Sequence, residues 1–267
     1  MEPVRVAVNG YGRMGGAIVS LVINSEAGGQ VELFRVFDIN EKLSGIVQGS
    51  DVEIYTYREG FFGECLPGAD VIIDVSSPAG FSGRANMASS LKIPLVVGTT
   101  GLSEEDRACL RKAAEYIPCV LAANFSLGVN FLFWLVEQAT AILGEGFDPE
   151  IMEIHHRRKK DSPSGTANRL AEIIAAVRGW DPKEVSRYGR QGIIGERPDG
   201  EIGIHSLRGG DVVGEHTVFF LGDGDRLELT SRITSRDAFA QGAVRAAKWV
   251  VGQKPGLYDM QDVLGLR

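Results

Sequence analysis

Val4-Arg5-Val6-Ala7-Val8-Asn9-Gly10-Tyr11-Gly12-Arg13-Met14-Gly15 opens the chain and decides the fold of its first half. The first five residues form a short apolar run typical of a strand, and a segment of helical periodicity follows the last glycine. Gly10, Gly12 and Gly15 therefore fit the pattern G-x-G-x-x-G between a strand and a helix. The first two glycines permit a tight turn and the close approach of a pyrophosphate, and the third lets helix and strand pack closely. This stretch predicts a dinucleotide-binding unit.

A second apolar run, residues 31–37, ends in Asp38, which lies 23 residues after Gly15. An acidic residue at this place, at the end of the second strand, accepts hydrogen bonds from an adenosine ribose. No arginine directly follows Asp38, so the sequence favours NADH. Arg35 and Lys42 leave the use of NADPH open.

Nearly continuous apolar runs recur at residues 71–75, 95–97 and 119–123. Such runs are typical of strands that are covered on both faces of a parallel sheet. Helical segments at residues 84–91 and 103–115 separate them. This alternation predicts an α/β fold, with a doubly wound parallel-sheet (Rossmann) dinucleotide domain.

Small polar residues follow these apolar runs. They form the clusters Ser76-Ser77-Pro78, Gly98-Thr99-Thr100-Gly101 and Asn124-Phe125-Ser126. Ligands of doubly wound sheets bind beyond the carboxyl ends of the strands. We therefore expect these clusters to line the nicotinamide side of the crevice.

The second half of the chain predicts a smaller α+β domain. An apolar, aromatic-rich helix at residues 129–143 marks the transition, and the domain is expected to span residues 127–235 after a dinucleotide domain of residues 1–126. Its other expected elements are a strand at 150–154, a helix at 167–177, strands at 202–208, 214–221 and 226–234, and a closing helix at 237–251. The strands alternate imperfectly, which is typical of an open mixed sheet with one exposed face.

His155-His156-Arg157-Arg158-Lys159-Lys160 is a run of basic or titratable side chains in a chain of formal net charge −7. By itself such a run indicates a solvated loop. Here it follows a nucleotide-binding half, which indicates hydride transfer to a small anionic substrate. Reduction of a conjugated imine or enone also needs a proton, and histidine and lysine deliver protons near neutral pH.

Alternation along a strand points His155 to the same face as Glu153, and His156 to the opposite face, unless the strand ends first. Lys159 returns to the same site if the loop folds back. Ser164-Gly165-Thr166, at a helix start, offers backbone N–H groups and hydroxyls to a carboxylate. The adjacent histidines have no third ligand nearby in the sequence, so no metal site is expected.

Composition argues against several classes of protein. The negative net charge disfavours a general nucleic-acid binder, because a phosphate backbone binds broad basic surfaces. No stretch is expected to reach the roughly 18 apolar residues that a membrane span needs. Cys65, Cys109 and Cys119 form no CxxC pair and indicate free thiols in a reducing cytoplasm.

The stretch from Glu153 to Ala167, with its motif His-His-Arg-Arg-Lys-Lys-Asp-Ser-Pro-Ser-Gly-Thr, resembles the signature of the dihydrodipicolinate reductase family. The similarity covers nearly the whole chain. It extends through residues 12–15, 97–101, 123–126 and 208–217. The resemblance implies NAD(P)H-dependent reduction of a cyclic unsaturated imine dicarboxylate to tetrahydrodipicolinate, in lysine and diaminopimelate biosynthesis.

The resemblance also implies roles for residues. His155 is the implied acid/base residue and Lys159 the second proton donor, and the implied carboxylate-binding residues are His156, Ser164, Gly165 and Thr166. The implied cofactor contacts are Asn9, Gly10, Tyr11, Gly12, Arg13, Met14, Asp38, Gly98, Thr99, Thr100, Ala122, Ala123, Asn124 and Phe125. A homotetramer built through the second domain's sheet is implied, and residues 236–267 return to the dinucleotide domain.

The chain departs from the family pattern in two places. The family commonly has glycine at the position of Asn9, and glutamate followed by arginine where this chain has Asp38-Ile39. The choice between NADH and NADPH therefore stays open.

Two other functions stay open. A dehydrogenase of the semialdehyde type needs a cysteine nucleophile at a helix start, with a histidine partner. Cys119 begins an apolar strand and Cys65 is expected in a short loop bounded by glycine and proline, so neither fits. A non-catalytic, NAD-binding redox sensor explains the nucleotide loop but gives no reason for the histidine-lysine cluster.

Overall fold

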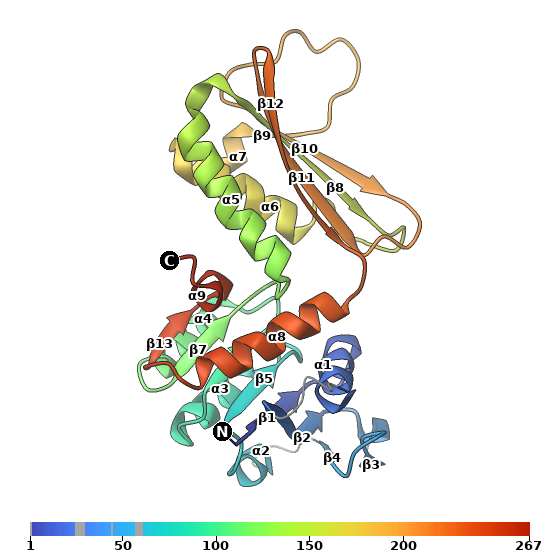
Figure 1. Cartoon of the computed structure of the whole chain (residues 1–267), viewed down its shortest axis with the longest axis vertical. Helices are drawn as coiled ribbons and strands as arrows, with labels where there is room; N and C mark the ends of the chain where they lie inside the picture. The colour runs from blue at the N-terminus through green and yellow to red at the C-terminus, as the bar shows by residue number, and fades with distance from the viewer. Residues whose placement is uncertain (1, 25–29, 44, 57–60) are drawn as a thin grey trace. The chain divides into compact units, whose positions relative to one another are not determined.

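The structure is a computed structural model that describes residues 2–24, 30–43, 45–56 and 61–267. The chain divides into two compact units (Figure 1). The first unit combines Met1–Leu127 with the closing segment Arg236–Arg267, and the second unit is Gly128–Ser235.

The described part of the first unit forms an eight-stranded sheet in the order β13-β7-β6-β5-β1-β2-β4-β3. All neighbouring strands pair in parallel except β3, which runs antiparallel to β4. The strand order reverses between β1 and β5, which is the switch point of a doubly wound sheet. The strands are β1 (Val4–Asn9), β2 (Val31–Asp38), β3 (Gly45–Ile46), β4 (Glu53–Thr56), β5 (Val71–Asp74), β6 (Leu95–Val97), β7 (Pro118–Leu121) and β13 (Gly256–Tyr258).

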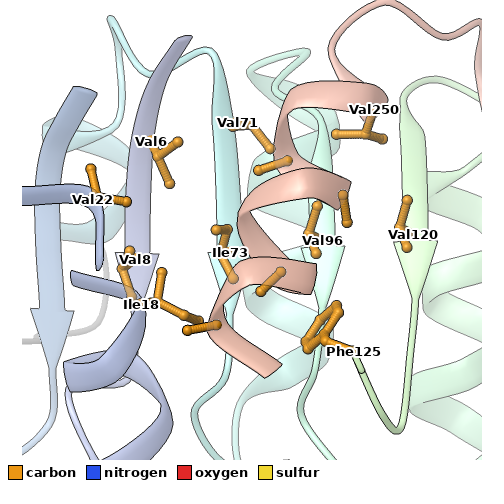
Figure 2. Packing of buried hydrophobic residues seen from close by; sticks show 14 of the residues in the cluster. Val6, Val8, Ile18, Val22, Val71, Ile73, Val96, Val120, Phe125 and Val250 are labelled. Atoms are coloured by element: carbon orange, nitrogen blue, oxygen red, sulfur yellow. The ribbon is translucent and has the colours of Figure 1, made fainter. Parts of the chain in front are cut away.

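Helices cover both faces of this sheet, which confirms the predicted doubly wound fold. One apolar cluster joins α1 and α8 to the strands through residues such as Ile18, Ile73 and Val250 (Figure 2). A second cluster joins α3 and α4 to the opposite face through Phe81 and Leu110. The helices of this unit are α1 (Arg13–Asn24), η1 (Glu41–Leu43), α2 (Phe61–Cys65), α3 (Phe81–Ser90), α4 (Glu104–Ala113), α8 (Asp237–Val250) and α9 (Met260–Leu264).

The second unit contains a five-stranded mixed sheet in the order β12-β11-β8-β10-β9. Strand β10 is parallel to β8 and β9, whereas β11 is antiparallel to β8 and β12, so the predicted mixed sheet is confirmed. Helix α6 packs on β8, β10 and β11. The elements are α5 (Leu127–Leu143), η2 (Gly144–Gly146), β8 (Asp148–His155), α6 (Gly165–Arg178), α7 (Pro182–Val185), β9 (Ser186–Tyr188), β10 (Ile202–Arg208), β11 (Gly214–Gly222) and β12 (Asp225–Ile233).

Helix α6 begins at a serine cap. Ser164 is its N-cap, and the Ser164 hydroxyl accepts a hydrogen bond from the amide of Ala167 at 3.1 Å. Such a cap satisfies one of the amides that the first helical turn leaves without an intrahelical partner. The cap therefore fixes the start of α6 directly after the loop that follows β8.

Two sequence-based expectations are wrong. Cys65 is the last residue of α2 and does not lie in a loop. Among the described residues, the segment Leu127–Gly146 is long and apolar enough to span a membrane by length and composition, although no such stretch was expected. Its buried side chains include Val129, Leu132 and Val136. Core helices of soluble proteins pass the same test, so this single segment is weak evidence for a membrane.

Helix α8 packs closely against the segment after β7 because small side chains line its buried face. A Cβ atom added to Gly242 would lie 1.8 Å from the carbonyl oxygen of Phe125. We therefore expect Gly242→Ala to lower the free energy of unfolding by about 2 kcal/mol, because the backbone must shift to admit the methyl group. Urea unfolding measures this change.

Gly16→Ala is the matched control, because Gly16 is also a helical glycine and its added Cβ atom would meet nothing within 4 Å. This variant should be at least as stable as the wild type, since alanine favours a helix over glycine. Equal stability of the two variants would contradict the close packing of α8.

Candidate functional site

A cavity of about 280 Å³ opens in the first unit at the switch point between β1 and β5. Four of the residues expected to bind the cofactor line it, namely Asn9, Gly10, Gly12 and Asp38. The remaining lining residues are Ile39, Val75, Ser76, Ser77, Ala79 and Arg84. The cavity therefore lies beyond the carboxyl ends of the strands, where doubly wound sheets bind ligands.

Close backbone packing explains the glycines of the first loop. Gly10 has φ +94°, and a Cβ atom on it would lie 2.7 Å from the Cα atom of Ser76. A Cβ atom on Gly15 would lie 1.7 Å from the Gly10 carbonyl oxygen. Glycine has no Cβ atom, so it tolerates both the positive φ and the close approach of neighbouring backbone atoms. The loop thus brings its backbone to the start of α1, where a helix N-terminus favours an anion.

The Asp38 carboxylate is held in place by backbone amides. Its Oδ2 accepts a hydrogen bond from the amide of Tyr11 at 2.6 Å, and its Oδ1 accepts one from the amide of Asn40 at 2.8 Å. A carboxylate has about four acceptor positions, so positions remain for ribose hydroxyls. The neighbouring Ile39 side chain is 73% exposed and offers no positive charge to a phosphate.

The other expected cofactor contacts lie in the same unit but outside the lining of this cavity. They are Tyr11, Arg13, Met14, Gly98, Thr99, Thr100, Ala122, Ala123, Asn124 and Phe125. Gly98 to Thr100 directly follow β6, and Ala122 to Phe125 directly follow β7. All of them therefore lie near the carboxyl ends of parallel strands.

Sequence reasoning assigned no role to two charged residues of this unit. Asp74 and Arg84 form an ion pair of 2.7 Å between Oδ2 and Nε, and they are 1% and 6% exposed. The one sequence feature that pointed to this ion pair was Asp74, a single acidic residue inside the apolar run of β5. A charge in such a run needs a partner, but the sequence does not say which residue supplies it.

In the second unit, the carboxylate of Glu153 on β8 organises the site. Its oxygens accept hydrogen bonds from both Nη atoms of Arg208 at 2.7 Å, and from the backbone amide of Ser164 at 3.1 Å. Its Oε2 lies 2.5 Å from Nδ1 of His155. Burial alone would raise the pKa of Glu153, but hydrogen bonds from Arg208 and His155 outweigh burial and lower this pKa to about 2.

His155 lies on the same face of β8 as Glu153, as alternation predicted. Because the ionised Glu153 carboxylate can only accept, His155 donates from Nδ1 and, when neutral, keeps its lone pair on Nε2. Burial lowers the pKa of His155, and the charges of Lys159 and Arg208 lower it further against the opposing effect of Glu153. His155 is therefore neutral at pH 7.

Lys159 lies in the loop after β8. Its amide donates to the carbonyl of His156 at 3.0 Å, and its Nζ lies 2.9 Å from Oδ2 of Asp161. Nη2 of Arg208 donates to the carbonyl of Asp161 at 2.8 Å, so the loop also contacts the arginine that pairs with Glu153. The return of Lys159 to the site of His155 stays a prediction. The catalytic role of Lys159 stays a prediction.

Sequence reasoning assigned no role to His216 on β11, which is 2% exposed. Its Nε2 lies 2.9 Å from the Ser164 hydroxyl, and its ring lies edge-on to His155 at 5.1 Å between centroids. Burial, followed by the neighbouring His155, lowers the pKa of His216 to about 4. The one sequence feature that pointed to His216 was its position as a histidine within an apolar strand.

The expected carboxylate-binding residues are placed by two different segments. His156 comes directly after β8, so strand alternation does not fix its side chain. Its amide donates to the carbonyl of Val212 at 2.7 Å. Ser164, Gly165 and Thr166 form the N-cap and the first two residues of α6. The first turn of α6 therefore lies beside Glu153, to which the amide of Ser164 donates.

Cys65 and Cys119 do not have the properties of a nucleophile. Cys119 is buried, and burial raises the pKa of its thiol to about 12. Burial also raises the pKa of Cys65. A thiol needs a lowered pKa to act as a nucleophile near neutral pH. Within the described ranges, no three His, Cys, Asp or Glu residues are grouped to hold a metal ion.

The lowered pKa of His216 predicts a pH dependence of stability. Between pH 6.5 and about pH 4, the unfolded chain binds a proton at His216 that the folded unit does not bind. The free energy of unfolding should therefore fall by about 3 kcal/mol as the pH decreases through this window. Urea unfolding at several pH values measures it.

His216→Asn should remove most of this slope, while His155, whose pKa is also lowered, leaves a smaller slope in the same direction. An unchanged slope in the variant would show that His216 is not buried in its neutral form.

Comparison with known proteins agrees with this geometry. Residues 4–125 match the family model "Dihydrodipicolinate reductase, N-terminus", and residues 128–264 match "Dihydrodipicolinate reductase, C-terminus". The chain is 46% identical over 269 residues to the 4-hydroxy-tetrahydrodipicolinate reductase of Syntrophus aciditrophicus, covering 98% of each chain. It is also 46% identical over 273 residues to that of Geotalea uraniireducens, covering 99% of this chain and 100% of the relative.

The comparison with solved structures also finds a dihydrodipicolinate reductase. The dipicolinate-bound dihydrodipicolinate reductase of Paenisporosarcina sp. TG-14 matches with a TM-score of 0.78 and 27% identity, covering 97% of this chain and 98% of that chain. A probable dehydrogenase from Thermotoga maritima shares the fold, with a TM-score of 0.64 and 14% identity over 97% of this chain and 92% of that chain. The chain belongs to the dihydrodipicolinate reductase family.

Proposed function

We propose that this chain is a 4-hydroxy-tetrahydrodipicolinate reductase, an NAD(P)H-dependent oxidoreductase of lysine and diaminopimelate biosynthesis. It reduces a cyclic unsaturated imine dicarboxylate to tetrahydrodipicolinate. The observation that carries the proposal is the hydrogen-bonded chain of Arg208, Glu153 and His155 beside the first turn of α6, in which Glu153 and His155 are buried. A redox sensor without catalysis would not need this arrangement.

The first unit is proposed to bind the cofactor, through Asp38 at the adenosine ribose and the loop of residues 9–14 at the pyrophosphate. The residues after β6 and β7 are proposed to contact the nicotinamide part. These are Gly98, Thr99, Thr100, Ala122, Ala123, Asn124 and Phe125. The proposed dinucleotide domain is residues 1–126 with 236–267.

The second unit, residues 127–235, is proposed to bind the substrate. His156, Ser164, Gly165 and Thr166 are proposed to hold its carboxylates. The N-terminal end of α6 supports this assignment, because helix N-termini favour negative charge. The related Paenisporosarcina enzyme is described as dipicolinate-bound, and dipicolinate is a dicarboxylate.

When bound, NAD(P)H would supply a hydride, and with it two electrons, to one carbon of the conjugated double bond, and the neighbouring atom would take a proton. His155 is the proposed acid/base residue and Lys159 the second proton donor. Since His155 is neutral in the free protein, it must gain a proton at Nε2 before it can donate one.

A cytoplasmic homotetramer that binds neither nucleic acid nor a membrane is proposed for the assembled protein. The net charge of −7 supports the first exclusion. Exposed apolar side chains on the strands of the second unit, including Leu207, Leu221 and Leu227, support an assembly through its sheet.

The reaction can be tested directly with both cofactors. We expect rapid oxidation of NADH when freshly made substrate is added, and a kcat/KM for NADH about tenfold above that for NADPH, because Asp38 repels a 2′-phosphate. Absorbance at the nicotinamide band at equal cofactor concentrations measures both values. Binding of NADH without turnover would support a redox sensor instead.

The role of His155 can be tested by substitution. His155→Gln should lower kcat by about 10²-fold or more, because general acid–base catalysis is lost, and should leave NADH affinity nearly unchanged. His205→Gln is the matched control, since His205 lies on β10 and contacts Glu150, not Glu153. Full activity of His155→Gln would overturn the acid/base assignment.

A further inference from the structure

The carboxylate of Asp74 is the meeting point of several hydrogen bonds at the carboxyl end of β5. Its Oδ1 accepts from the hydroxyl of Ser76 at 2.6 Å, from the amide of Ser76 at 3.2 Å and from the hydroxyl of Thr99 at 2.8 Å. Its Oδ2 accepts from Nε of Arg84 at 2.7 Å. Asp74 is 1% exposed, so protein groups and not bulk water satisfy this charge.

Asn9, one of the two departures from the family pattern, joins the same network. Its Nδ2 donates to the Ser76 hydroxyl at 3.1 Å, and that hydroxyl in turn donates to Asp74. A glycine at this position would lack the side chain for this bond. The end of β1, directly before the glycine loop, is thus connected to the loop after β5.

Arg84 extends the network along the loop after β5. Its Nη1 donates to the carbonyl of Ala79 at 2.7 Å and its Nη2 to the carbonyl of Ser77 at 2.6 Å. Ser77, Ala79 and Arg84 all line the cavity proposed to hold the cofactor. The buried guanidinium therefore fixes the backbone of one wall of this cavity.

The loop after β6 is held by the same residue. The Thr99 hydroxyl binds the Asp74 carboxylate, and the amides of Gly98 and Thr99 donate to the Asp74 carbonyl at 2.8 Å and 3.2 Å. A single residue therefore links the end of β1 with the loops that follow β5 and β6.

We propose that Asp74 is a positioning residue for the cofactor, which presets the end of β1 and the loops after β5 and β6 around the dinucleotide site before the cofactor binds. This inference rests on the proposed function, because it takes the cavity of the first unit as the cofactor site. Preorganised loops raise affinity because binding need not order them. Asp74 acts through Asn9, Ser76, Thr99 and Arg84.

The chemistry of a carboxylate is essential to this task. An asparagine at position 74 has one acceptor oxygen and one NH₂ donor. Whichever way the amide turns, its NH₂ faces either Arg84 or the donors of Ser76 and Thr99. The substitution also leaves the Arg84 charge buried without a counter-ion.

We therefore expect Asp74→Asn to raise the dissociation constant of NADH about tenfold, with kcat at saturating NADH close to the wild-type value. Binding is measured by NADH fluorescence on the full chain, below the unfolding temperature of each variant. Asp70→Asn is the matched control. Asp70 precedes the same strand at its opposite end and pairs with Arg5, so NADH affinity should not change.

Two further variants separate positioning from stability. In Asp74→Asn/Arg84→Met the unpaired buried charge is removed, so the melting temperature should recover while NADH binding stays weak. Ser76→Ala keeps the ion pair and breaks the link to Asn9, and it should weaken NADH binding about threefold.

The outcomes distinguish the two proposals. Wild-type NADH affinity in Asp74→Asn, or in the double variant once its stability has recovered, would overturn the positioning role and leave the proposed function intact. Wild-type affinity in Ser76→Ala would overturn the connection through Asn9. A wild-type chain that binds neither NADH nor NADPH would overturn the cofactor site, and the positioning role with it.

Discussion

A buried carboxylate with an arginine partner is the constraint on which the second unit depends. Glu153 is fully buried, and a buried charge is tolerated when it is paired and its lone pairs are hydrogen-bonded. Its partners come from β10, from β8 itself and from the start of α6. The register of β8 and β10 brings Arg208 close to Glu153, since Arg208 lies opposite His155, two residues further along β8. The charge thus couples the sheet, the helix start and the histidine.

The first unit also contains a buried carboxylate that is paired with an arginine. Asp74 pairs with Arg84 from the helix that follows β5, and Glu153 pairs with Arg208 from another strand. In both units the carboxylate lies at or near the carboxyl end of a strand, and polar groups of the neighbouring segments converge on it. Removing either carboxylate would leave an arginine without its counter-ion, the buried Arg84 in the first unit and the partly buried Arg208 in the second. The placement of the neighbouring groups and the stability of the unit are therefore coupled at both carboxylates.

The sequence predicted the features that depend on local chemistry. Apolar runs, glycines and the serine cap of α6 determine strands, turns and helix starts within a few residues, and the family motif predicts the roles of His155 and Lys159. The sequence did not predict the arginine partners of Glu153 and Asp74. Arg208 lies 55 residues from Glu153, and His216 lies 52 residues from Ser164, so only the register of the sheet brings them together. Short elements such as β9, β13 and α9 lack the length that shows periodicity.

The electrostatics of the His155 site connect ligand charge with protonation. In the free protein, burial and the charges of Lys159 and Arg208 oppose a proton on His155, and the single carboxylate of Glu153 favours it. A bound dicarboxylate would add negative charge near the ring, which raises the pKa of a histidine. The proton would then be held when the substrate is present. Under the proposed function, the anionic groups of the substrate would both anchor it and favour protonation of His155, the proposed acid.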